Sequence, residues 1–96
     1  MKIEWNLDKD IINLKKHNIS FKEASEIFHD TLHISVLDER IDYSEERWIT
    51  IGQTKKTLLV VVAHTYMESN GYETIRIISA RKATKKERVQ YENCEI

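Results

Sequence analysis

The 96 residues are enough for one domain with its own hydrophobic core and too few for two. Hydrophobic residues make up 41% of the chain and charged residues 32%, which excludes a disordered protein, and no apolar run approaches the roughly 20 residues that cross a bilayer. The start lacks the pattern of a signal peptide and the single Cys94 excludes an internal disulfide, so we expect a cytoplasmic domain over residues 1–96 without membrane contact.

The first helix is predicted to begin after a short segment, residues 3–5, that is compatible with a strand. Asn6 and Asp8 supply capping side chains, and the helix should run to about His17. We expect its apolar residues to face inward: Leu7, Ile11, Ile12 and Leu14. Asn18 tolerates the left-handed conformation that ends many helices, so the chain should turn there.

A second, shorter helix is predicted directly after this turn. Ser20 and Glu23 have the spacing of a capping box, which places the start of the helix at Phe21. The apolar residues that recur at helical spacing are Phe21, Ala24, Ile27 and Phe28.

From Leu32 onward the pattern changes to alternation and β-branched residues, which is typical of strands. The predicted strands are residues 32–38, 47–52, 57–66 and 72–80. The third is apolar on both faces and should lie inside the sheet. Asn70-Gly71 predicts a two-residue hairpin between the last two strands.

The C-terminal helix is predicted from Thr84 and Glu87, another capping-box pair. The chain therefore reads as an α+β domain with two N-terminal helices, an antiparallel sheet of about four strands and a C-terminal helix.

Charge is unevenly distributed although the net charge is only −1. Residues 1–50 carry −4 and residues 51–96 carry +3. From Arg76 to Arg88 there are six basic residues and one acidic residue, Glu87. Such a patch, at the junction of the last strand and the last helix, suits a polyanion such as RNA.

The hairpin predicts how the basic residues face the sheet. With the tip at Asn70-Gly71, residues whose numbers sum to 141 lie opposite each other: Val60 and Arg81, His64 and Ile77, Thr65 and Arg76. His64 and Arg81 would then share one face, about 13 Å apart, and Arg76 would lie on the other. A β-bulge would alter this assignment.

If the patch binds RNA and the site is catalytic, attack of a ribose 2′-hydroxyl on the phosphate would need a base, an acid and positive charge on the transition state. Arg81 is the leading candidate for phosphate stabilisation, with pairing to a helix carboxylate as the alternative. His64 is the acid–base candidate because histidine titrates near neutral pH, with a hydrogen-bonded structural role as its alternative. Arg76 and Tyr91 complete the candidate catalytic set, although Tyr91 also fits packing against the sheet.

Other basic residues are candidates for RNA contact: Lys16, His17, Arg47, Lys82, Lys85 and Arg88. Lys16 and His17 can instead complement a helix dipole, and Arg47 can belong to an exposed ion pair. Only His29 and His33 have the four-residue spacing of helical metal ligands, and the second falls past the expected helix end. We therefore expect no metal and no other cofactor.

Four blocks in a characteristic order resemble the BrnT family of toxins. The blocks are Ile3-Glu4-Trp5 with Asn13 to His17, Ile19 to Ala24 with Phe28 and Asp30, Glu45-Glu46-Arg47 leading to Ile51-Gly52, and Leu58 to Thr65 with Arg76 to Tyr91. The resemblance implies a RelE-like fold and a metal-independent endoribonuclease that inhibits translation and growth.

The resemblance also implies partners. A BrnA-like antitoxin would hold the toxin inactive in a hetero-oligomer of two toxins and two antitoxins, and DNA would be contacted only through that complex. Family members often have arginine soon after the histidine–threonine pair, where this chain has Met67. If that arginine takes part in catalysis in relatives, this protein would be weakened or would rely more heavily on Arg76 and Arg81. The alternative is a non-catalytic interaction module that acts with its antitoxin in transcriptional autoregulation.

Overall fold

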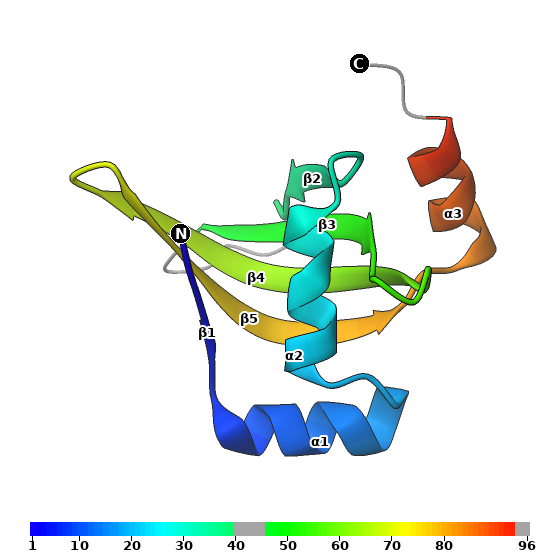
Figure 1. The fold of residues 1–96 in the computed structure, drawn as a ribbon, viewed down its shortest axis with the longest axis horizontal. Coiled ribbons are helices and arrows are strands. Elements are labelled where there is room, and N and C mark those ends of the chain that lie inside the picture. The colour runs from blue at the N-terminus through cyan, green and yellow to red at the C-terminus, as the bar shows by residue number, and fades with distance from the viewer. Residues whose placement is uncertain (40–45, 94–96) are drawn as a thin grey trace.

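The fold is built on a twisted sheet with strand order β1-β5-β4-β3-β2 (Figure 1). The computed structural model describes residues 1–39 and 46–93. Its strands are β1 (Lys2–Trp5), β2 (Ile34–Leu37), β3 (Arg47–Gln53), β4 (Leu59–Ser69) and β5 (Tyr72–Lys82). The α+β class is confirmed, and so is the antiparallel pairing of β2 with β3, β3 with β4 and β4 with β5. The expectation of an all-antiparallel sheet of four strands is wrong, because within the described residues β1 adds a fifth strand, parallel to β5.

Local capping determines where the helices begin, as predicted. The helices are α1 (Leu7–His17), α2 (Phe21–Ala24), the 3₁₀ helix η1 (Ser25–His29) and α3 (Lys85–Glu92). Asn6 caps α1, Ser20 caps α2, and Thr84 forms the expected capping box at α3. Asn18 ends α1 in the left-handed region, with φ of 59°. Of the described helices, none has the length and apolar character needed to span a membrane.

The α2 and η1 helices cross one face of the sheet, which we call the helix-covered face (Figure 1). The main core lies between these helices and the sheet, and its fully buried side chains include Phe21, Ile27, Val60, Val62 and Ile77. The other side of the sheet is called the opposite face, and among the described elements α3 covers it at one end. There Tyr91 of α3 packs near Ile51, Leu59 and Val61. Most of the opposite face therefore carries residues that are not part of a core.

Helix α1 packs in the reverse of the predicted orientation. Its four aliphatic side chains are exposed: Leu7 by 72%, Ile11 by 54%, Ile12 by 63% and Leu14 by 46%. The inward expectation for these residues is wrong, because polar side chains attach the helix instead. Asn13 is buried, and Asp10 Oδ1 accepts a hydrogen bond from the Phe21 backbone N–H over 2.8 Å.

The Asn13 amide substitutes for a neighbouring strand at the end of β5. Its Nδ2 donates to the Ala80 carbonyl at 2.9 Å, and its Oδ1 accepts from the Ala80 N–H at 3.1 Å. A third bond joins Nδ2 to the Ile19 carbonyl at 3.0 Å. Since β1 leaves β5 at the Trp5–Ile77 pair, this side chain satisfies backbone groups that β1 does not reach. The same bonds secure the residue that precedes Arg81.

Candidate nucleic-acid interface

A β-bulge interrupts the pairing of β4 and β5. His64 lies opposite Ile77, but Ala63, the residue before it on β4, lies opposite Ser79. Ile78 is therefore an extra residue on β5. The predicted register is confirmed between the hairpin turn and His64, and it is wrong beyond that point.

The bulge changes which residues share a face. Arg81 lies opposite Val61 rather than Val60. Because side chains alternate along a strand, one extra residue moves Arg81 away from the face of His64 and onto the face of Arg76. The candidate catalytic residues are thus divided by the sheet, with both arginines on the opposite face.

Polar residues from four neighbouring strands form a row across the opposite face. The pairings Arg47–Thr65, Thr65–Arg76 and Glu4–Arg76 align them. Arg76 Nε lies 3.8 Å from Glu4 Oε1, and a cavity of about 200 Å³ is bordered by Glu4, Thr65, Arg76 and Glu46. Glu4 was missed in the sequence because its position beside Arg76 depends on the parallel pairing of a strand distant along the chain.

Arg81 forms a paired hydrogen bond with a helix carboxylate. Its Nη1 and Nη2 donate to Glu87 Oε1 and Oε2 over 2.7 and 2.9 Å, while Glu87 also accepts from the Thr84 N–H. The Arg81 hydrogen bonds hold the pKa of Glu87 at about 2. This is the structural alternative considered for Arg81, yet 43% of its side chain remains exposed.

A second group of predicted RNA ligands meets between the end of α1 and the start of α3. Lys16, His17, Arg81 and Lys82 line one open cavity of about 500 Å³, together with Lys15, Asn18 and Thr84. Arg81 therefore belongs both to the opposite face and to this cavity, which we call the α1–α3 cavity. Sequence spacing had separated Lys16 and His17 from Arg81 by more than 60 positions.

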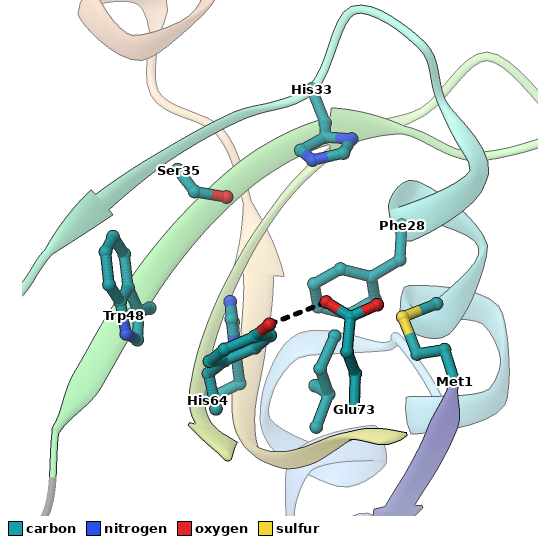
Figure 2. Close-up of a pocket in the computed structure, with 9 residues that line it drawn as sticks. Met1, Phe28, His33, Ser35, Trp48, His64 and Glu73 are labelled. Atoms are coloured by element: carbon teal, nitrogen blue, oxygen red, sulfur yellow. Dashed lines mark hydrogen bonds between the residues drawn. The ribbon is translucent and has the colours of Figure 1, made fainter. Parts of the chain in front are cut away.

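His64 lies in the core on the helix-covered face, beside a separate cavity of about 350 Å³ (Figure 2). It is 4% exposed and packs edge-on against Phe28. Its Nδ1 lies 3.1 Å from the Thr65 carbonyl and must donate, which leaves Nε2 to accept from Thr50 Oγ1 at 2.7 Å. Ser35 in turn lies 2.7 Å from Thr50 Oγ1. Burial lowers the pKa of His64, which favours this neutral form.

Tyr91 is held by a carboxylate at the edge of the sheet. Its hydroxyl donates to Asp30 Oδ2 over 2.6 Å, and burial together with this bond raises the pKa of Tyr91 to about 12. The arrangement fits the packing alternative for Tyr91. Lys85 and Arg88 lie exposed on α3.

The described residues contain no cluster of three His, Cys, Asp or Glu side chains that could hold a metal ion. Positive charge is concentrated in the α1–α3 cavity, whereas on the opposite face Arg76 lies beside Glu4 and Glu46. A surface of this kind can bind phosphates, and the imidazole of His17 lines the same α1–α3 cavity.

Comparison with known proteins identifies relatives. Residues 5–87 match the family described as "Ribonuclease toxin, BrnT, of type II toxin-antitoxin system". The crystal structure of the Brucella abortus ribonuclease toxin BrnT has the same fold, with a TM-score of 0.61 and 22% sequence identity over 88% of this chain and 99% of that one. Comparison with curated proteins gives no significant match. Because the family match spans most of the chain, this protein belongs to the BrnT family of ribonuclease toxins of type II toxin–antitoxin systems.

Proposed function

We propose that this protein is a metal-independent endoribonuclease that cleaves RNA to inhibit translation and growth. The observation that carries the proposal is the bulge at Ile78, which gives Arg76 and Arg81 the same face of the sheet. Bulges often re-aim side chains beside active sites. The two arginines are five residues apart on β5, a separation of roughly 15 Å, so one bound RNA strand can reach both.

Arg81 is proposed as the ligand of the reacting phosphate. Its guanidinium can offer two hydrogen bonds to phosphate oxygens as negative charge grows in the transition state. Glu87 keeps the guanidinium oriented before substrate binds. Arg47 and Arg76, together with Lys82, Lys85 and Arg88, would contact neighbouring phosphates.

His17 replaces His64 as the proposed acid–base residue. The ring nitrogens of His64 both have protein partners in the core, whereas His17 lines the α1–α3 cavity with Arg81. There its imidazole could take the proton of the 2′-hydroxyl or supply one to the leaving 5′-oxygen. Lys16 would add positive charge at the same place. Tyr91 and His64 are assigned to the stability of the fold.

The proposed partners follow from family membership. A BrnA-like antitoxin would bind the toxin in a hetero-oligomer in the cytoplasm, block RNA access, and make the only contact with DNA. Catalysis by side chains alone, without a metal ion, as in RelE-like enzymes, is part of the same proposal.

The test is cleavage of a defined RNA by purified protein, with wild type compared with Arg81→Ala and His17→Gln. We expect Arg81→Ala to lower the rate about a hundredfold to a thousandfold, because it removes a transition-state charge contact. Lys86→Ala removes the same charge from exposed α3 and serves as the matched control. EDTA should leave the rate unchanged. Folded Arg81→Ala that cuts at the wild-type rate, or cleavage abolished by EDTA, would refute the proposal.

One observation favours the non-catalytic alternative, which is the pairing of Arg81 with Glu87. If that pair is purely structural, the protein acts with its antitoxin in autoregulation. Pure wild type would then leave RNA intact while still binding the antitoxin.

A further inference from the structure

The exposed side of α1 carries an apolar stripe that nothing in the described chain covers. Leu7, Ile11 and Leu14 follow one another at spacings of four and three residues, so they lie on one side of the helix. In Figure 1, α1 lies along the lower edge of the molecule with no described element beyond it. A helix that attaches through Asn13 and presents its aliphatic side to solvent is typical of an interaction surface.

Charges beside the stripe are arranged by sign along the helix axis. The first turn contains Asp8 and Asp10, and the last turn contains Lys15, Lys16 and His17. At 100° per residue, Asp8 and Lys15 fall on the same flank of the stripe. One flank is thus acidic at its start and basic at its end.

We propose that this stripe is a self-association surface, where α1 pairs antiparallel with α1 of a second copy. A two-fold axis near Ile11 would place Leu7 against the partner subunit's Leu14, and Asp8 beside the partner subunit's Lys15. The symmetry repeats each contact. A parallel pair would instead place like charges together, so the charge order selects the antiparallel arrangement.

The pairing would be weak. A three-turn helix buries a few hundred Å² per partner, compared with about 800 Å² in a standard stable interface. The dimer should therefore form only as concentration rises. Lys16 is about 180° around α1 from Leu7 and would stay clear of the dimer, whereas Lys15, which also borders the α1–α3 cavity, would lie at the edge of the interface.

Sedimentation equilibrium over a concentration series tests the proposal without reference to nuclease activity. Wild type should show a concentration-dependent dimer, and Ile11→Gln should abolish it. Asp8→Lys should raise the dimer Kd about tenfold, because it converts two attractive pairs into repulsive ones. Asp8→Lys combined with Lys15→Asp should restore association. Val36→Gln changes an aliphatic residue that is similarly exposed, by 59%, on β2, and it should behave as wild type.

A second measurement checks the geometry. In a Cys94→Ser background, Ile11→Cys lies near the proposed two-fold axis and should form an intermolecular disulfide under mild oxidation. Wild type that stays monomeric at every concentration overturns the proposal, as does association unaffected by Ile11→Gln or by charge reversal. Protection of α1 from hydrogen exchange only when the antitoxin is bound would assign the stripe to the antitoxin and would also overturn it.

Discussion

Replacing Asn13 with alanine would remove three hydrogen bonds, two with Ala80 at the end of β5 and one with Ile19. The side chain is 6% exposed, so water cannot readily take its place. The Ala80 N–H and the carbonyls of Ala80 and Ile19 would lose their partners. We expect the substitution mainly to lower the free energy of unfolding. It should also affect the candidate site, because Arg81 directly follows Ala80 on β5.

The magnitude follows from the groups left unsatisfied. A buried backbone group without a partner costs about 1–3 kcal/mol, and carbonyls tolerate the loss better than N–H groups, which gives about 3 kcal/mol in all for Asn13→Ala. For a domain of this size that corresponds to a fall in Tm of about 15 °C. The loss is a large part of the roughly 5–15 kcal/mol that stabilises a typical domain.

Urea unfolding followed by tryptophan fluorescence measures this loss, since Trp5 packs against Phe21 close to α1. Lys9→Ala alters an exposed residue on the same helix and should change stability by less than about 0.5 kcal/mol. If Asn13→Ala unfolds within about 1 kcal/mol of wild type, the reasoning that Asn13 substitutes for a strand is refuted.

Two further predictions concern ionisation. The folded pKa of His64 is lowered below 6.5, so the unfolded state binds its proton more readily and stability should fall as pH drops below about 6.5. Nitrogen-15 NMR at pH 7 should show a proton on Nδ1 and none on Nε2, and the reverse tautomer would contradict the hydrogen-bond assignment. The folded pKa of Glu87 is about 2 against 4.5, so its stabilisation is present above pH 4.5 and is lost as pH falls toward 2. Because Arg81 is 43% exposed, we expect roughly 1 kcal/mol from this pair, and Glu87→Gln should flatten the acid limb of a stability–pH curve.

The sequence by itself determined the features that depend on neighbouring residues. Ser20 binds an N–H three positions away, and Thr84 and Glu87 bind each other across the same spacing. Asn70 and Gly71 adopt the positive φ angles of a tight hairpin turn. These contacts form within one turn of chain, so residue type and spacing suffice to predict them.

Only the tertiary structure decided how these elements face one another. Helical periodicity showed that Leu7, Ile11 and Leu14 share a side, but whether that side packs was decided by Asn13 and its bonds to Ala80, 67 positions away. The distances along the chain make such contacts invisible to local patterns.

The candidate site was decided in the same way. The sequence of residues 76–88 predicted its positive charge. It did not predict on which face of the sheet Arg76 and Arg81 would lie. The extra residue Ile78 reverses the side-chain alternation beyond it, and parallel pairing of β1 brings Glu4 beside Arg76. Both depend on register between strands, which is set by the packing of the whole sheet rather than by the residues of one strand.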